Sequence, residues 1–125
     1  MSAIVVLDAN SLLMPFQFRL NLDLELERLV GPARVIVLSS VAGEVKNLAD
    51  GGNRHAKAAL KLLTKYEQVL VGGRGDAAIL SFVRKNPGCV LVTNDKALGR
   101  RAAAAGARCI MLFKNRCLAW ATEED

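Results

Sequence analysis

Five short apolar runs, spaced along the chain, are the feature that most constrains how it folds. They consist mainly of Val, Ile and Leu and do not alternate with polar residues, which is the pattern of strands buried on both faces of a sheet. Helix-length segments separate them, and strand alternating with helix is typical of a parallel sheet covered by helices. The five predicted strands are Ile4–Leu7, Val35–Leu38, Val69–Val71, Val90–Val92 and Ile110–Leu112.

Residues that begin or end helices lie between these runs. Ser, Asn or Asp precedes apolar residues at helical spacing, and Gly or Pro then ends most of the segments. We therefore expect an α/β fold: a three-layer α/β/α sandwich around a short parallel five-stranded sheet, formed by residues 1–125 as a single domain. The predicted helices begin at Ser39 or Ser40, at Asn53, at Gly75-Asp76, at Asn94-Asp95 and, as a last short helix, at Lys114.

The stretch Met14–Glu27 fits two patterns. Apolar residues at every second position favour a strand, whereas the leucines from Leu22 onward also fall on one helical face. We predict an extended piece around Pro15–Leu20, followed by a helix from about Leu22. The apolar Met14–Phe18 region is either an edge of the core or a surface for a homodimer or protein partner.

Composition excludes several classes of protein. With 52% hydrophobic and 23% charged residues among 125, the chain is not disordered and is long enough to bury a core. Its apolar runs are too short to cross a membrane, and its N-terminus lacks the basic start and long apolar stretch of a signal peptide. Three cysteines without C-x-x-C spacing indicate reduced thiols rather than a zinc site, and hence a cytoplasmic protein.

The charge balance points to an anionic partner. The chain has 17 Lys and Arg against 12 Asp and Glu, and three of these acids are the terminal residues 123–125, so the preceding residues carry a net charge of +8. Residues 96–116 hold six basic side chains and no acidic one. Nucleic acid is favoured over a membrane, because no basic amphipathic anchor helix is evident; a merely soluble basic surface is the alternative. The candidate phosphate-binding residues are Lys46, Arg74, Lys96, Arg100 and Arg101.

Four acidic residues follow successive predicted strands. Asp8 comes directly after the first, and Glu44 lies in the second turn of the helix after the second. Asp76 begins the helix after the third, and Asp95 follows the fourth in Thr93-Asn94-Asp95. Because parallel strands end at the same edge of a sheet, we expect these carboxylates to converge there.

Each carboxylate taken alone has a simpler explanation. Asp8 and Asp95 could cap helices, Asp76 could interact with a helix dipole, and Glu44 could be solvated. Four converging carboxylates, however, repel one another unless a cation holds them, and oxygen ligands suit Mg²⁺ or Mn²⁺. Such a site suits metal-assisted displacement at a phosphodiester.

The residues around these acids resemble the PIN-domain superfamily of ribonucleases over essentially the whole chain. The resemblance is carried by Val5-Val6-Leu7-Asp8-Ala9-Asn10, Glu44, Gly75-Asp76-Ala77-Ala78-Ile79 and Val92-Thr93-Asn94-Asp95. Leu13–Phe18 and Thr93–Arg101 look like the branch related to ribosomal RNA processing nucleases, with the toxin branch of toxin–antitoxin pairs as a near relative.

The resemblance implies a metal-dependent endoribonuclease that uses Mg²⁺ or Mn²⁺ to cut single-stranded or structured RNA. The catalytic and metal-binding residues it implies are Asp8, Glu44, Asp76 and Asp95. Around them, Asn10 is expected to support Asp8 or a metal-bound water, or merely to serve the turn. Thr93 and Asn94 are expected to orient a water or the substrate, although Asn94 equally suits a turn.

Two positions depart from the family pattern. Relatives often have further acids where this chain has Ala77 and Ala97, so one metal is readily held and a second lacks ligands. A non-catalytic RNA-binding or assembly module is therefore an alternative, as is a toxin-type ribonuclease. A haloacid-dehalogenase-like phosphatase is the rival enzyme class, but that family requires an Asp where this chain has Asn10.

Overall fold

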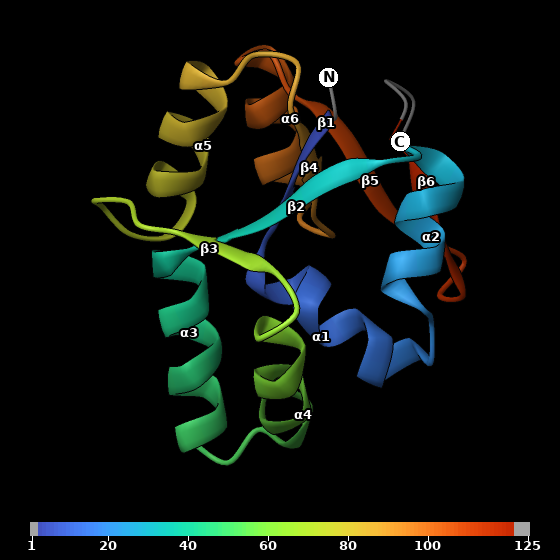
Figure 1. The fold of residues 1–125 in the computed structure, drawn as a ribbon, viewed down its shortest axis with the longest axis vertical. Helices are drawn as coiled ribbons and strands as arrows, with labels where there is room; N and C mark the ends of the chain where they lie inside the picture. The colour runs from blue at the N-terminus through green and yellow to red at the C-terminus, as the bar shows by residue number, and fades with distance from the viewer. Residues whose placement is uncertain (1–2, 122–125) are drawn as a thin grey trace.

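The computed structural model describes residues 3–121 and contains one mixed sheet with the strand order β3-β2-β1-β4-β5-β6 (Figure 1). The first five strands run parallel, and β6 pairs antiparallel with β5. The strands are β1 (Ala3–Leu7), β2 (Ala33–Leu38), β3 (Glu67–Val69), β4 (Val90–Val92), β5 (Arg108–Phe113) and β6 (Cys117–Trp120). The helices are α1 (Ala9–Phe18), α2 (Leu22–Leu29), α3 (Ser39–Asp50), α4 (Arg54–Leu63), α5 (Gly75–Lys85) and α6 (Lys96–Ala104).

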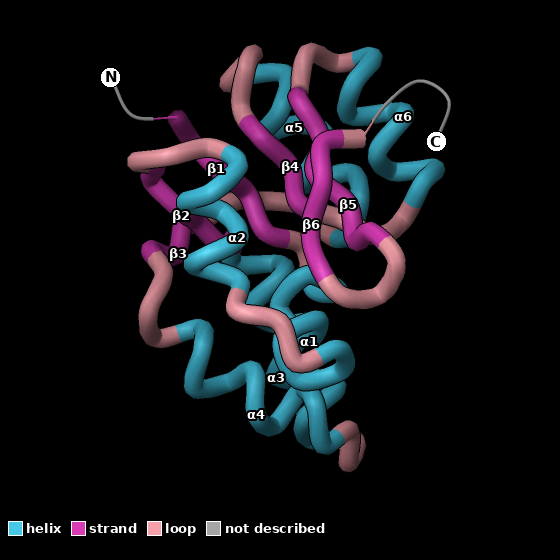
Figure 2. Tube along the Cα trace, turned by 90° about the vertical axis from the view of Figure 1, so that its right-hand side faces the viewer, coloured by secondary structure: helices cyan, strands magenta, loops and turns pink. Residues whose placement is uncertain are grey.

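Helices cover the sheet from two sides. Figures 1 and 2 both show α5 and α6 together at one end of the view and α1, α3 and α4 together at the other, with the strands between them. The central strands β1 and β4 form the middle of the core, and all three residues of β4 are completely buried. Within residues 3–121, the helices are too short to cross a membrane. The predicted α/β alternation is confirmed.

The prediction of a last helix from Lys114 is wrong. Lys114 and Asn115 both adopt left-handed backbone conformations, with φ of 53° and 57°, and the chain reverses into β6. Figure 2 shows β5 and β6 side by side as a hairpin, which gives the sheet a sixth strand. Pairing with the free edge of β5 and burial of Leu118 stabilise a strand that local sequence pattern did not reveal.

The extended piece predicted around Pro15–Leu20 is also wrong in large part, because α1 continues to Phe18 with Pro15 inside it. Proline inside a helix costs about 3 kcal/mol, so packing must offset it. Leu12, Leu13 and Met14 are buried in the core, which fixes this segment as a helix. The helix predicted from Leu22 is confirmed as α2.

The third strand lies two residues earlier than predicted. It pairs with β2 over Glu67–Val69, and Arg34 of β2 makes a two-bonded ion pair with Glu67. Val71 is instead tied to α3, because the Ser39 hydroxyl accepts from its N–H at 3.0 Å and donates to its carbonyl at 3.3 Å. The intervening Leu70 is 90% exposed, so apolarity alone misplaced the strand.

Candidate functional site

One pocket of about 160 Å³ gathers all four predicted carboxylates. It lies where the parallel strands end and the following helices begin, at the turns that lead into α1, α3, α5 and α6 (Figure 1). No Lys or Arg of the described residues lines it. The lining residues are Asp8, Ala9, Asn10, Ser40, Val41, Glu44, Gly75, Asp76, Ile79, Asp95 and Leu98.

Asp8 is the most deeply placed of these acids. It is only 5% exposed, and one carboxylate oxygen accepts from the Ser11 N–H at 2.8 Å, so Asp8 caps α1. Burial raises the pKa of the Asp8 carboxyl above its ordinary value; the Thr93 side chain and Ser11 act to lower it, and the Glu44 carboxylate raises it further. The influence of Glu44 on Asp8 is repulsion between two carboxylates that face the same pocket.

Asp95 is held on the opposite wall through Thr93. The completely buried Thr93 hydroxyl accepts from the Asp95 N–H at 3.0 Å, and Asp95 Oδ1 accepts from the Leu98 N–H at 3.1 Å to cap α6. Thr93 therefore connects the turn after β1, which carries Asp8, with the turn after β4, which carries Asp95. Each cap uses the Oδ1 atom of its carboxylate.

Glu44 and Asp76 are exposed at the mouth. Within the described residues 3–121, neither carboxylate has a hydrogen-bond or ion-pair partner. Glu44 projects from the second turn of α3, and Asp76 lies in the first turn of α5. The pocket thus combines one buried and three exposed acids without a compensating base.

A buried hydroxyl in the same pocket also lacks a partner. Ser40 Oγ is the one buried side-chain polar atom in the described part of the chain that has no hydrogen bond. Such an atom costs free energy unless water or a ligand satisfies it. Sequence reasoning treated Ser40 only as a helix cap, but the backbone of Leu38 occupies the cap position without any side-chain cap bond.

The donor set fits a hard divalent cation. Carboxylate and hydroxyl oxygens are the ligands that Mg²⁺ and Mn²⁺ prefer, and an uncompensated cluster of acids attracts a cation. As the side chains stand, no three His, Cys, Asp or Glu residues within positions 3–121 are close enough to enclose an ion. The exposed Glu44 and Asp76, which no hydrogen bond or ion pair within the described residues holds in place, would therefore have to turn inward toward Asp8 and Asp95 when an ion binds.

The structure brings together some of the predicted supporting residues and separates others. Asn10 lines the carboxylate pocket and Thr93 lies behind it, whereas Asn94 lines a neighbouring pocket with Lys96. Arg74 caps the start of α5, and Lys46 lies on the exposed side of α3; neither lines the carboxylate pocket. The remaining predicted phosphate contacts, Lys96, Arg100 and Arg101, lie on α6.

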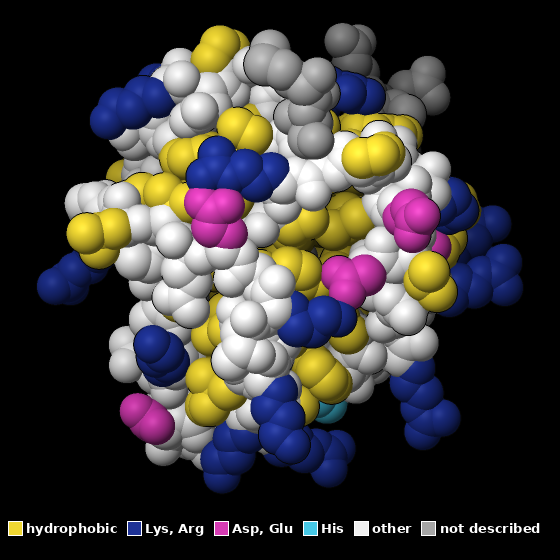
Figure 3. Space-filling model, in the orientation of Figure 1, with side chains coloured by type: hydrophobic (Ala, Val, Ile, Leu, Met, Phe, Trp, Pro, Cys, Tyr) yellow, Lys and Arg dark blue, Asp and Glu magenta, His cyan; other side chains and the backbone are white. Residues whose placement is uncertain are grey.

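On the face seen in Figure 3, basic side chains gather over α4 at the lower edge. This helix contributes the exposed Arg54, Lys57 and Lys61. Sequence reasoning did not single out this group as a cluster, although the spacing of its members on one helix would have shown it. The group lies apart from the carboxylate pocket, which none of its members lines.

Comparison with known proteins connects this geometry to one family. The profile described as "PIN like domain" matches residues 5–115. Ribonuclease VapC4 of Methanocaldococcus jannaschii is 28% identical over 102 residues, which cover 75% of this chain and 78% of that protein. Ribonuclease VapC9 of Archaeoglobus fulgidus is 33% identical over 105 residues, which cover 81% and 76%.

The fold has a counterpart among solved structures. The structure of the PIN domain endonuclease Utp24 superposes with a TM-score of 0.80, covering 94% of this chain and 90% of that chain. The two sequences are 18% identical, so this likeness speaks for the fold alone.

Proposed function

Because the chain belongs to the family of PIN-like domains, we propose that it is a metal-dependent endoribonuclease that hydrolyses RNA phosphodiester bonds. The observation that carries the proposal is the single pocket lined by four acids and no base, at the carboxyl edge of the parallel sheet. The names of the two VapC ribonucleases support RNA as the substrate.

Asp8, Glu44, Asp76 and Asp95 are the residues that would hold Mg²⁺ or Mn²⁺. When bound, such a cation supplies Lewis acidity toward a phosphodiester oxygen and makes coordinated water more acidic. Asp8 and Asp95 are fixed by their capping bonds, so they provide the rigid part of the site. Thr93 positions both of them, and Ser40 and Asn10 offer polar atoms to a water or to the RNA.

Two biological roles are consistent with a ribonuclease of this family. RNA processing in the cytoplasm is our proposal, with the processing-nuclease motifs of Leu13–Phe18 and Thr93–Arg101 as its support. A toxin-type ribonuclease is the second candidate, supported by the similarity to VapC4 and VapC9. A processing enzyme should cut one structured RNA at few positions, whereas a toxin should stop growth when expressed alone.

Cleavage of single-stranded and structured RNA with and without Mn²⁺ tests the activity. We expect cleavage in Mn²⁺, none in chelator, and none from Glu44→Gln. The matched control is Asp50→Asn, which removes an exposed acid from the same helix outside the pocket and should leave cleavage unchanged. RNA binding without cleavage would instead support a binding module, and phosphate release from small esters a phosphatase.

A further inference from the structure

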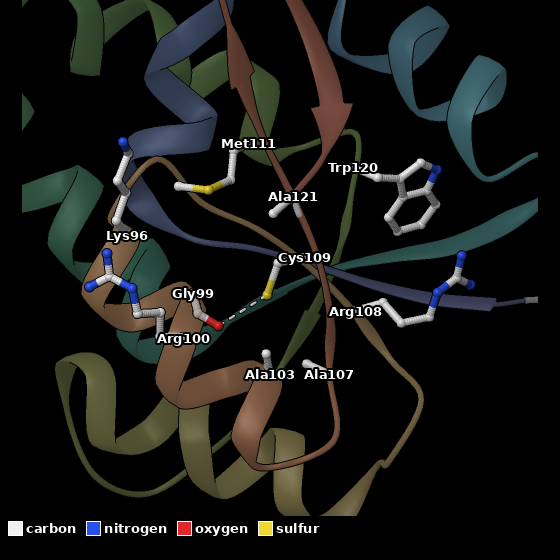
Figure 4. Close-up of a pocket in the computed structure, with 10 residues that line it drawn as sticks. All are labelled: Lys96, Gly99, Arg100, Ala103, Ala107, Arg108, Cys109, Met111, Trp120 and Ala121. Atoms are coloured by element: carbon white, nitrogen blue, oxygen red, sulfur yellow. Dashed lines mark hydrogen bonds between the residues drawn. The ribbon is translucent and has the colours of Figure 1, made fainter. Parts of the chain in front are cut away.

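A second pocket, of about 550 Å³, lies between α6 and the β5–β6 hairpin (Figure 4). Its floor is apolar, and Figure 4 shows Lys96 and Arg100 on one side and Arg108 with Trp120 on the other. The Cys109 thiol at its centre donates to the Gly99 carbonyl, so it is already used in packing. The lining residues are Lys96, Gly99, Arg100, Ala103, Ala107, Arg108, Cys109, Met111, Trp120 and Ala121.

Charge distinguishes this pocket from the carboxylate pocket. Three cationic side chains line it and no acidic residue does, within the part of the chain that the structure describes. Arg108 lies over the Trp120 ring, with its guanidinium carbon 4.2 Å from the ring centroid, so the aromatic wall is itself positively charged. A ligand that has a flat apolar group with anionic groups next to it would match both the apolar floor and the cationic rim of the pocket.

The two pockets lie on neighbouring faces of the first turns of α6. Asp95 and Leu98 line the carboxylate pocket, whereas Lys96, Gly99 and Arg100, which share one helical face, line the second. A smaller adjoining pocket that includes Asn94 shares Lys96 and Trp120, and no acid among residues 3–121 lines it. Because the consecutive residues Asp95 and Lys96 line different pockets, an RNA strand whose scissile phosphate lies in the carboxylate pocket would continue across the first turn of α6 into the second pocket.

We propose that this second pocket holds one nucleobase of the RNA strand next to the bond that is cut. The base lies on the apolar floor between α6 and Met111, against the Trp120 wall. Lys96, Arg100 and Arg108 contact the phosphates on either side of it. This inference rests on the proposed ribonuclease activity and adds a base-binding subsite to it.

The test uses matched pairs of variants on α6. Ala103 lines the pocket and the adjacent Ala104 does not, and both side chains are exposed on the same helix. Ala103→Glu and Ala104→Glu therefore make the same change in charge, but only the first places a carboxylate in the pocket. The substrate is a single-stranded RNA of defined sequence, together with versions that carry one abasic position at each site in turn.

We expect one abasic position near the cut to lower kcat/KM of the natural enzyme about tenfold in Mn²⁺, as loss of a single docked base would. Ala103→Glu should raise KM by a similar factor with little change in kcat, and should remove the sensitivity to that abasic position. Ala104→Glu should keep it. Equilibrium binding to an uncut RNA, measured in the Asp8→Asn background, should show the same contrast.

Several results would overturn the inference. Cleavage that is equally sensitive to Ala103→Glu and Ala104→Glu, or insensitive to every abasic position, would mean that no base enters the pocket. Ala103→Glu could also affect cleavage only in a variant whose Glu123, Glu124 and Asp125 have been made neutral. That result would mean that the acidic end of the chain, and not an RNA base, competes for the pocket. Failure of the natural enzyme to cleave any RNA in Mn²⁺ would reject the proposed function itself, and is distinct from both results.

Discussion

The two pockets beside α6 differ in charge and also in how firmly they are built. The carboxylate pocket rests on β1 and β4, whose facing residues are completely buried in the middle of the sheet. The second pocket, proposed above to hold a nucleobase and called the base pocket from here on, rests on β5 and the edge strand β6, whose one strand neighbour within residues 3–121 is β5. The comparison teaches that this fold sets the acidic pocket on its most deeply buried strands and the cationic pocket at the edge of the sheet, where local opening is easier.

The outer edge of β6 is covered by side chains rather than by another strand. Glu25 of α2 accepts from the Leu118 N–H at 2.8 Å, and Arg28 donates to the Leu118 carbonyl at 2.7 Å. Together they satisfy both backbone groups of Leu118, in the strand that carries Trp120. The wall of the base pocket therefore depends on two polar residues of α2.

The largest expected effect is on the carboxylate pocket. Asp8→Asn should reduce RNA cleavage more than about a hundredfold. Loss of a residue that only positions a metal ligand lowers activity by up to about this factor, and Asp8 is itself a proposed ligand. Stability should stay equal or rise, because the amide oxygen can still accept from Ser11 while a buried charge is lost. Cleavage assays and thermal melts check both parts. Loss of cleavage with strong destabilisation would show that Asp8 is mainly structural.

Metal binding should stabilise the fold only through the carboxylate pocket. At about one hundred times its dissociation constant, Mn²⁺ should add roughly 2.7 kcal/mol to the free energy of unfolding. Asp76→Asn should lose most of this gain, whereas Ala103→Glu, in the base pocket, should keep it. Melting temperatures with and without Mn²⁺ decide the matter. A gain in melting temperature that survives Asp76→Asn would place the ion elsewhere.

Lowering the pH should destabilise β6, the strand that forms the wall of the base pocket, before it affects the central strands. Hydrogen bonding from Arg28 lowers the pKa of Glu25 below its ordinary value of 4.5, although partial burial opposes the shift. Because the folded pKa is lower, the stabilisation is complete above pH 4.5 and is lost as the pH falls through the folded pKa. Glu25→Gln should cost about 1 kcal/mol at neutral pH and flatten this acid dependence. Denaturant titrations at several pH values measure it, and an unchanged acid profile in Glu25→Gln would contradict the assignment.

The same contrast between centre and edge explains what the sequence could predict. The runs that became β1, β2 and β4 are apolar because they are buried, so pattern alone predicted the last residue of all three strands correctly, whereas it ended β3 two residues too late. The positions of β3 and β6 depend on partners distant in sequence, Arg34 and Ser39 for one and α2 for the other. The local sequence pattern cannot predict contacts between residues so far apart in the chain.

The two pockets also differ in how far the sequence could predict them. The gathering of four carboxylates follows from strand order, since residues at the ends of parallel strands must meet. Sequence therefore placed Asp8, Glu44, Asp76 and Asp95 in one pocket, while their role as metal ligands stays a prediction. The unsatisfied Ser40 hydroxyl depends on side-chain packing, which no motif records. The base pocket requires the unpredicted strand β6, so it could not be foreseen.

The smallest expected effect separates two neighbouring arginines. Arg100 lines the base pocket, whereas Arg101, also exposed on α6, does not. Arg100→Ala should weaken RNA binding across all sequences and reduce the slope of log affinity against log salt by about 0.7, the value for one lost phosphate contact on a single strand. Arg101→Ala should change neither quantity. Stability should barely move in either variant, because exposed charges contribute little. Salt titrations of RNA binding in the Asp8→Asn background measure the difference. Equal effects of the two substitutions would mean that the arginines attract RNA through general charge, and that the pocket beside Arg100 does not set the path of the strand.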